Sequence, residues 1–319
     1  MKGMLRKETG IFVLLVVLCA VTAIKEPKFL GIENLTNMSR LIGMYGIFSI
    51  GAGMVIITGG IDLSVGSMFA LLGVLLAMAL SEKHWSTPLA VGAVLAMGVL
   101  LGVLHAFLIT RVKLQPFIVT LCGLLFYRGI ARFIANDETK GFGDSAGFEG
   151  LKAFATGSLF GVPMAFVIFL VLSLITGVIL HRSVYGRHLF AAGRNEDAAR
   201  YSGINTRRVI GSTYVLAGFL AGVAGILIAF YTNSISPSSH GNFYELYGIA
   251  AAVLGGCSLR GGEGSIVGIA LGTILLQVLQ NLVNLLGIPS SLNFAVMGAV
   301  ILFGVLADRL LHARSTAQR

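Results

Sequence analysis

The stretch ITGGIDLSVGSM, residues 57–68, places glycines, hydroxyl groups and one aspartate between two strongly apolar runs. Glycine ends a helix readily because it adopts left-handed backbone angles without a Cβ penalty. Asp62 or Ser64 then caps the next helix by accepting a hydrogen bond from a free N–H near its start, and a carboxylate suits the positive end of the helix dipole. Interrupted backbone at membrane depth is tolerated only inside protein or beside a water-filled cavity. The segment therefore caps a helix, or lines a translocation path or forms its gate, and the capping and path roles are compatible with each other.

The chain around this segment is too apolar for a soluble domain. Of its 319 residues, 56% are hydrophobic and only 12% are charged, where soluble domains average about 25% charged residues. Apolar runs near 20 residues long indicate membrane-spanning helices, and their continuity excludes a β-barrel. We predict an all-α polytopic membrane protein with about ten transmembrane helices, at roughly 10–24, 41–58, 63–80, 88–110, 115–135, 163–180, 209–231, 245–258, 264–286 and 292–307. The eighth segment is short enough to be re-entrant.

The net charge of +9 follows membrane topology. With the N-terminus inside, fifteen of the 23 lysines and arginines fall on inner segments, six on outer segments and two within the fifth helix. This is the positive-inside bias of a protein with both termini in the cytoplasm, and it gives no reason to expect nucleic acid. The basic N-terminus followed by an apolar run also fits a signal peptide. We favour an uncleaved first helix because nine further hydrophobic segments follow it.

We treat residues 1–319 as a single transmembrane domain with two long loops. The glycine-rich loop 136–162 is predicted outside, and loop 181–208, with six arginines, inside. Within the inner loop, residues 194–201 are predicted to form a short helix with Asn195 as its N-cap, ending at Gly203. Such a helix suits a membrane subunit that receives force from a soluble partner; the alternative is an ordinary solvated loop.

A short internal repeat relates two of the interruptions. GGIDLSVG (59–66) and GGCSLRGG (255–262) share glycines and a leucine at the same spacing, and each joins two hydrophobic segments. Paired interruptions often flank the path in transporters. Both copies fall on the same predicted face, which does not fit an inverted repeat. The predicted hinge residues are Gly59, Gly60, Gly66, Gly255 and Gly256.

Polar residues also occur inside the predicted ninth and fifth spans. Amide side chains at positions 277, 280, 281 and 284 share one helical face. They either bond to neighbouring helices or line a path for a neutral polyhydroxylated substrate. Arg128 and Arg132 share a face of the fifth span and are expected to snorkel or to pair with a carboxylate near its outer end.

Several classes of chemistry lack their residues in this sequence. No GK[ST] segment occurs, so the chain has no P-loop for ATP. Asp62 and Glu245 are the only carboxylates near span interiors, too few for a proton relay. Three cysteines in or beside apolar segments predict neither a disulfide framework nor a cysteine metal site. We therefore expect no catalytic residue, no metal site and no cofactor in this chain.

Three segments resemble the ribose-type permeases, the transmembrane subunits of bacterial ABC importers for monosaccharides. They are TGGIDLSVGS (58–67), GRNEDAARYSGI (193–204) and ELYGIAAAVLGGCSLRGGEGSIVG (245–268). QPFIVTLCGLLFYRGIAR (115–132) and QNLVNLLG (280–287) also match, and the resemblance covers roughly 40–308. Relatives commonly read ELDAIAA where this chain has Tyr247 and Gly248 in ELYGIAA, so no role for an acid is carried over to that position.

The resemblance implies the partners and the site. It implies a bacterial inner-membrane permease that pairs with a second copy or a paralogue and receives a monosaccharide from a periplasmic sugar-binding protein. It further implies two cytoplasmic ATP-binding domains, separate or in one tandem chain, that hold ATP and Mg; loop 136–162 is then periplasmic. The residues expected to line the path are Asp62, Ser64, Gln277, Asn281 and Asn284, and those expected to dock on the ATPase are Arg194, Asn195, Glu196, Ala199 and Gly203. The alternative is a secondary transporter of a small neutral polar solute that works without an ATPase.

Overall fold

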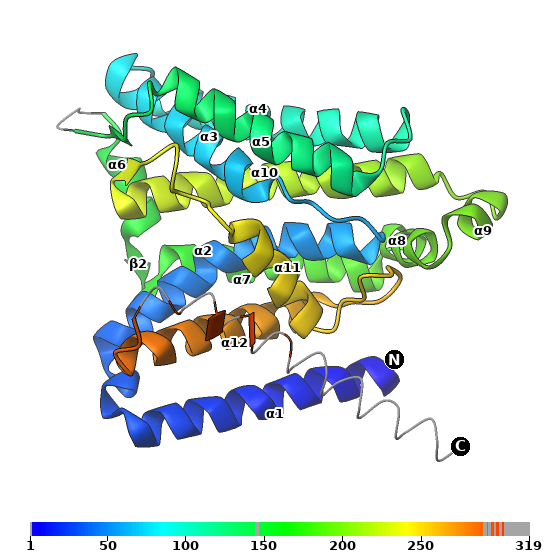
Figure 1. The fold of residues 1–319 in the computed structure, drawn as a ribbon, viewed down its shortest axis with the longest axis horizontal. Coiled ribbons are helices and arrows are strands. Elements are labelled where there is room, and N and C mark those ends of the chain that lie inside the picture. The colour runs from blue at the N-terminus through cyan, green and yellow to red at the C-terminus, as the bar shows by residue number, and fades with distance from the viewer. Residues whose placement is uncertain are drawn as a thin grey trace.

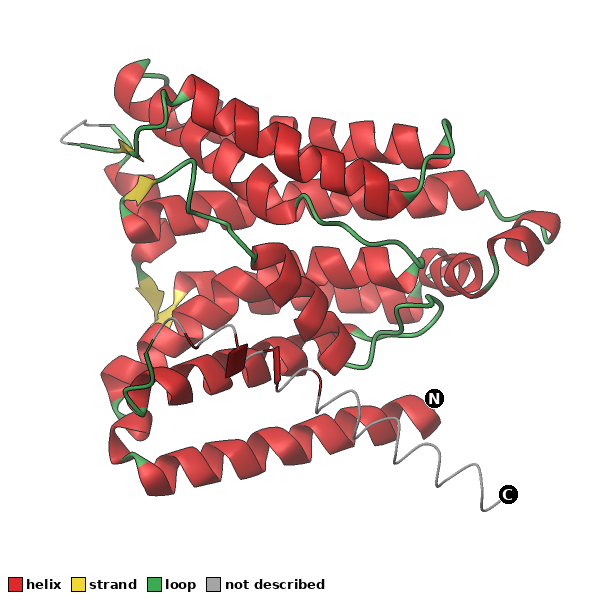
Figure 2. Ribbon diagram, viewed as in Figure 1, coloured by secondary structure: helices red, strands yellow, loops and turns green. Residues whose placement is uncertain are grey.

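The computed structural model describes residues 2–143 and 147–289, with isolated positions between 292 and 302. In chain order its elements are α1 (Lys2–Lys25), η1 (Pro27–Leu30), α2 (Ile32–Ile57), α3 (Val65–Ala77), η2 (Met78–Glu82), α4 (Thr87–Thr110), α5 (Pro116–Ile134), β1 (Lys140–Gly141), α6 (Glu149–Thr156), β2 (Ser158–Leu159), β3 (Val162–Pro163), α7 (Met164–Arg182), α8 (Val184–Arg194), α9 (Glu196–Tyr201), α10 (Thr206–Thr232), β4 (Ser234–Ile235), α11 (Tyr244–Leu254) and α12 (Ile266–Leu285). Almost all of this structure is helical, and the long helices run side by side (Figures 1 and 2).

Eight helices in the described ranges are long and apolar enough to cross a bilayer. They are α1, α2, α3 with its π-helical continuation η2, α4, α5, α7, α10 and α12, and they correspond to the first seven predicted spans and the ninth. The tenth predicted span, 292–307, lies outside the continuously described ranges. The second helix starts at Ile32, nine positions before the predicted start at 41, because its polar first turns continue beyond the apolar run.

The long helix α10 forms the centre of the bundle. It packs against α4, α2 and α3, and α1 lies at the edge of the molecule against α12 (Figure 1). Gly98 of α4 and Gly218 of α10 face each other so closely that a methyl group on either would overlap the carbonyl oxygen of the other. Small residues let membrane helices approach in this way, which gains dispersion contacts between the backbones.

A second close approach joins α2 to α7. A side chain at Gly43 would overlap the backbone of Ala165 and Phe166, and the ring of Phe169 occupies the space beside Gly46. Phe169 is fully buried there. Because apolar surface drives no helix association inside lipid, this interlocking of ring and backbone holds α7 in place.

The predicted eighth span is only half helical. The chain returns from the end of α10 through the short strand β4 and then without helix to the middle of the bundle, and α11 runs from there toward the basic end (Figure 1). With 11 residues, α11 is about 16 Å long, roughly half the hydrocarbon thickness. It packs among α2, α12 and α3. In the segment before it, Ile235, Pro237 and Gly241 are buried, whereas Ser238, Ser239, Asn242 and Phe243 are exposed.

The two arginines of α5 have different partners. Arg128 donates hydrogen bonds to the carbonyl oxygens of Pro237 and His240, at 2.8 and 2.7 Å, and so satisfies the irregular backbone before α11. Arg132 pairs with Asp137 at 2.5 Å just beyond the end of α5, which lowers the pKa of the Asp137 carboxyl below its usual range. The expected carboxylate partner thus exists for Arg132, whereas Arg128 binds carbonyl groups.

The loop 136–162 has structure of its own. It contains α6 and the β2–β3 hairpin, with Ser158 opposite Pro163, and its first strand pairs antiparallel with β4 after α10. The ring of Phe142 is buried and stacks on Phe230 of α10, with centroids 4.6 Å apart. This end of the bundle is called the opposite face below.

The other end of the bundle carries most of the positive charge and is called the basic face. It is formed by the 111–115 turn, α8, α9 and the 255–265 turn, at the right of Figure 1. The helix α8 lies within the predicted inner loop 181–208, where only the short helix at 194–201 was expected. Ser183 caps it by accepting a hydrogen bond from the Gly186 N–H, and Leu189 and Ala192 are buried on one of its faces.

We predict that Gly43→Leu strongly destabilises the fold, whereas Gly92→Leu does not. Both glycines are helical, but only Gly43 faces backbone atoms; a Cβ at Gly92 meets nothing within 4 Å. Overpacking costs about 1–3 kcal/mol, so the melting temperature of purified Gly43→Leu should fall by several degrees relative to Gly92→Leu. Equal melting temperatures for the two variants would contradict this helix contact.

Candidate functional site

The interruption 57–68 begins with a defined helix end. Gly59 adopts a φ of 81°. Its N–H donates to the Ile56 carbonyl at 2.8 Å, and the Gly60 N–H donates to the Val55 carbonyl at 3.1 Å. This bonding pattern is a Schellman motif, which satisfies the last carbonyl groups of α2 and turns the chain. The position needs glycine because the φ is left-handed.

Asp62 starts the next helix. Its Oδ1 accepts hydrogen bonds from the backbone N–H and the hydroxyl of Ser64, at 2.8 and 2.6 Å, and Ser64 is the residue directly before α3. Asp62 is 2% exposed and Ser64 is fully buried. The carboxylate lies inside the protein and closes a turn on the residue that leads into α3. Ser64 at the N-cap position makes no side-chain cap hydrogen bond to the first turn of α3, so the expected helix cap is not formed and the path-lining role of Asp62 and Ser64 stays a prediction.

A cluster of buried polar side chains, which the sequence analysis did not identify, lies beside this turn. His105 of α4 accepts or donates a 2.8 Å hydrogen bond with the Tyr127 hydroxyl of α5, and the hydroxyl of Tyr214 from α10 fills the space beside Gly60. All three side chains are buried. Among the described residues, the His105 Nδ1 and the Tyr214 hydroxyl have no hydrogen-bond partner. The available signal was the single histidine within the apolar run of α4.

The first turn of α3 contacts the irregular chain before α11. A Cβ at Gly66 would lie 2.5 Å from Oε2 of Glu245 and would overlap the carbonyl oxygen of Gly241. Glu245 is 8% exposed, and its negative charge lies at the positive end of the α3 dipole. Gly66 therefore lies within a helix and serves close packing, unlike Gly59 in the turn.

The second copy of the repeat ends α11 in the same way. Gly256 has a φ of 89°, its N–H donates to the Val253 carbonyl, and the Cys257 N–H donates to the Ala252 carbonyl, both at 2.9 Å. Gly256 thus corresponds to Gly59, one position away from the alignment of the sequence pattern, and Gly255 is the C-cap. The two segments then diverge, because the next helix begins only at Ile266, after Ser265 as its N-cap.

The predicted helix of the inner loop is confirmed as α9. Asn195 is its N-cap and accepts a hydrogen bond from the Ala198 N–H at 2.9 Å, and Gly203 turns the chain with a φ of 84°. Arg194, Asn195 and Gly203 are exposed, as a docking surface requires, whereas Ala199 is buried.

Two further residues of α9 have distinct surroundings. Oε1 of Glu196 accepts hydrogen bonds from Lys113 at 3.1 Å and from the Thr206 hydroxyl at 3.2 Å, which ties α9 to the α4–α5 turn and to α10. Tyr201, which sequence analysis did not select, is 86% exposed on the same helix. An exposed aromatic side chain on a short surface helix is a typical anchor for a protein partner.

The amide face of α12 is divided among three environments. Gln277 is buried at 3% exposure. Asn281 and Asn34 of α2 exchange two hydrogen bonds between their amide groups, at 3.0 and 2.7 Å. Asn284 is exposed. Asn281 therefore links α12 to α2 by hydrogen bonds. The path-lining role of Gln277 and Asn284 stays a prediction.

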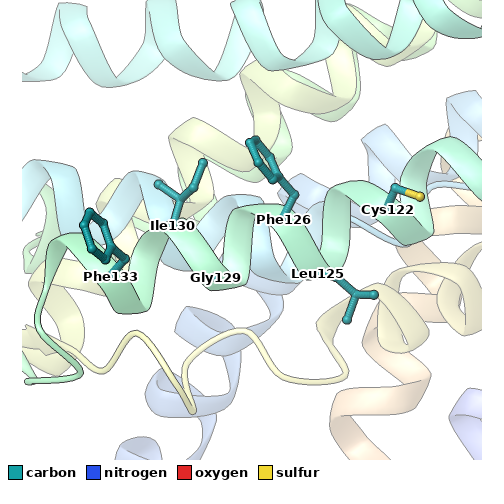
Figure 3. Close-up of a pocket in the computed structure, with 6 residues that line it drawn as sticks. All are labelled: Cys122, Leu125, Phe126, Gly129, Ile130 and Phe133. Carbon is teal, nitrogen blue, oxygen red and sulfur yellow. The ribbon is translucent and has the colours of Figure 1, made fainter.

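A shallow hollow on the surface of α5 contains no chemistry for a sugar. It is lined by Cys122, Leu125, Phe126, Gly129, Ile130 and Phe133, all from this one helix (Figure 3). An exposed apolar face of this kind suits lipid tails. Within the described ranges, no group of three or more histidine, cysteine, aspartate or glutamate residues is placed to hold a metal ion.

Parallel apolar helices, two interrupted crossings and a surface helix at the basic face define a membrane transport permease. The chain belongs to the family described as branched-chain amino acid transport system / permease component, which matches residues 34–305. It is 37% identical to the ribose import permease protein RbsC of Escherichia coli (strain K12) over 309 residues, covering 96% of this chain and 95% of that protein.

Two other relatives carry different names. The chain is 32% identical to the fructose import permease protein FruF of Bifidobacterium longum (strain NCC 2705), covering 91% of this chain and 83% of FruF. It is also 32% identical to the autoinducer 2 import system permease protein LsrD of Klebsiella pneumoniae subsp. pneumoniae, covering 98% and 94% of the two chains. The protein is thus a multi-pass permease of the ribose-type ABC importers in the bacterial inner membrane, a transport subunit.

We predict that Asp62→Asn keeps both stability and transport, whereas Asp62→Ala loses stability. Asparagine retains an oxygen that accepts from the Ser64 N–H, and alanine removes it; a buried donor left without its partner costs about 1–3 kcal/mol. Melting temperature and uptake by the two variants check this. Loss of uptake in Asp62→Asn at unchanged melting temperature would indicate that the charge itself meets the substrate.

We also predict that Asn34 and Asn281 are energetically coupled. Each single change to leucine leaves one amide of the pair without its partner, at a cost of roughly 0.6–2 kcal/mol. The double variant should lose less unfolding free energy than the two single variants lose together. A double-mutant cycle on thermal unfolding measures this difference. Additive losses would show that the two amides do not interact.

Proposed function

We propose that this chain is the permease subunit of an ATP-driven importer that moves a monosaccharide into the cytoplasm by alternating access. The observation that carries the proposal is the 37% identity to a ribose import permease over nearly the whole of both chains. Similarity to a fructose import permease over 91% of this chain supports a sugar as the substrate class. Ribose, fructose and related sugars are small, neutral and polyhydroxylated.

The charges of the bundle also favour a neutral substrate over an amino acid, the substrate in the family's description. A zwitterion needs fixed charges of both signs along its route. The buried charges near the interruptions already have internal roles: Asp62 binds Ser64, Arg128 binds two carbonyl groups, and Glu245 lies against α3. None of the three is available as a counter-charge in this conformation.

The basic face is the cytoplasmic face in this proposal, and α9 docks there in a groove of an ATP-binding partner. The positive-inside bias supports that orientation. The exposed residues Arg194, Asn195, Tyr201 and Gly203 supply the docking surface. The partner holds ATP and Mg, a second permease copy or paralogue completes the path, and a periplasmic binding protein delivers the sugar on the opposite face.

The second candidate function is a secondary transporter that needs no ATPase. Only the fold class supports this second function, because interrupted helices occur in secondary transporters as well. It requires a coupling ion or proton site inside the bundle. The buried carboxylates Asp62 and Glu245 would have to supply that site.

Reconstitution separates the two candidates. The chain is expressed with its neighbouring ATP-binding subunit, purified through a tag on the permease, and placed in liposomes with ATP on the side of the basic face. We expect the ATPase to co-purify and labelled ribose or fructose, presented with the cognate binding protein, to be taken up only with ATP. Uptake by the permease alone, driven by an ion gradient, would overturn the proposal.

We predict that Tyr201→Ala weakens association with the ATPase, whereas Phe160→Ala does not. Both are exposed aromatic residues, at 86% and 98%, on the basic and opposite faces respectively. Removal of an interface anchor typically costs at least 2 kcal/mol, which is roughly a 30-fold weaker Kd. Binding of the purified ATPase to each variant measures this, and equal affinities would place the docking surface elsewhere.

A further inference from the structure

Three segments that are far apart in the sequence meet at one point on the basic face. They are the end of α2, the end of α8 and the turn between α11 and α12. The Gly262 N–H donates a 2.8 Å hydrogen bond to the carbonyl oxygen of Ile57, the last residue of α2. The backbone of Gly193 lies against both residues. This contact, formed by Ile57, Gly59, Gly193, Gly261 and Gly262, is called the glycine junction.

The junction is built of backbone against backbone. A methyl group at Gly193 would overlap the Ile57 carbonyl oxygen, and one at Gly261 would lie 2.5 Å from the Gly193 carbonyl oxygen and 2.8 Å from the Gly59 nitrogen. A methyl group at Gly262 would lie 2.9 Å from Cα of Arg194. Any side chain at these three positions would therefore force the segments apart.

Such a contact transmits displacement with little loss. Side chains absorb small movements by changing rotamer, whereas directly packed backbones can only move together or separate. The hydrogen bonds from α9 to the α4–α5 turn and to α10 run through the Glu196 side chain. Its pair with Lys113 has side chains that are 37% and 47% exposed. Exposed pairs of this kind are weak and flexible.

We infer that Gly193, Gly261 and Gly262 are positioning residues that carry movement of α8 and α9 directly into both interrupted crossings. The inference rests on the proposed function, in which the ATPase moves α9. Through Ile57 and Gly59 the movement reaches the 58–64 turn and Asp62 at the start of α3. Through Gly261 and Gly262 it reaches the turn that follows α11. One displacement of α8 and α9 thus moves both the 58–64 turn and the turn that follows α11.

The first test compares two glycines with nearly equal backbone strain. Gly261 and Gly161 have φ values of 80° and 83°, but a Cβ at Gly161 meets nothing within 4 Å. Gly161→Ala, in the β2–β3 hairpin, therefore measures the strain alone. In reconstituted transporter we expect Gly261→Ala to take up roughly tenfold less sugar per ATP hydrolysed, with Gly161→Ala within about twofold of the unmodified protein. Equal coupling in the two variants would overturn the inference.

A second pair removes backbone strain from the comparison. Gly193 and Gly129 are both helical, and a Cβ at Gly129 meets nothing within 4 Å. Alanine favours a helix over glycine by about 1 kcal/mol, so neither change should weaken its own helix. We expect Gly193→Ala to bind the ATPase normally and to hydrolyse ATP without uptake, while Gly129→Ala transports normally. Full coupling in Gly193→Ala would contradict the inference.

A third test leaves every glycine of the junction unchanged, so it does not depend on whether the glycine variants fold. It measures distances between spin labels. Spin labels are placed at two exposed positions, Arg187 of α8 and Leu259 of the 255–265 turn, in the assembled transporter. We expect their distance to stay within about 2 Å between the nucleotide-free and ATP-bound states, whereas the Arg187-to-Arg187 distance between the two permease copies changes. A larger change of the first distance would overturn the inference, because the segments would then move independently. An unchanged second distance would instead contradict the proposed function.

Discussion

Every backbone N–H and C=O group inside a bilayer must find a partner within the protein, because lipid offers none. Two crossings of this chain are nevertheless broken, at 58–64 and at 233–243. Hydrogen bonds within the protein offset part of this cost. Two Schellman motifs satisfy the carbonyl groups at the ends of α2 and α11. Asp62 binds the N-cap residue of α3, and Arg128 of a separate helix binds two carbonyl groups of the irregular chain before α11.

Satisfying the backbone in this way requires very close packing, and glycine makes it possible. Gly66 admits the Glu245 carboxylate and the Gly241 carbonyl beside the first turn of α3. Gly60 leaves room for the Tyr214 hydroxyl, and Gly193 lets the end of α8 touch the end of α2. Glycine breaks the helices, which is costly in lipid. The same absence of a side chain lets these segments pack directly against one another. The interruptions are fixed parts of the fold in this conformation, with defined partners on α4, α5, α10 and α12.

This arrangement brings together the three segments on which the resemblance to the ribose-type permeases is based. The segments 58–67, 193–204 and 245–268 are widely separated in sequence, yet all three contribute to the glycine junction or directly adjoin it. The end of α8, directly before α9, is thus in backbone contact with the end of α2 and with the turn after α11. Broken helices are the elements whose rearrangement changes access in transporters. Under the proposed function, this contact places the docking helix and the broken crossings within one small region of the basic face.

The sequence by itself determined the membrane class, eight of the spans and the short helix α9, because hydropathy and capping are local properties that act within a single segment. It also indicated that the chain turns between two helices at Asp62, although the carboxylate binds Ser64 before α3 and forms no cap on the helix itself. Only the tertiary structure decided that Asn281 bonds to Asn34, that Arg128 serves the chain before α11, and that His105, Tyr127 and Tyr214 surround the Asp62 turn. Those partners lie on other helices, and which faces meet depends on the packing of the whole bundle. The offset of the repeat, with Gly256 in the position of Gly59, was likewise hidden from the sequence, because a left-handed φ is a property of the folded turn. The same holds for the glycine junction, which exists only where three distant backbones have been brought within contact of one another.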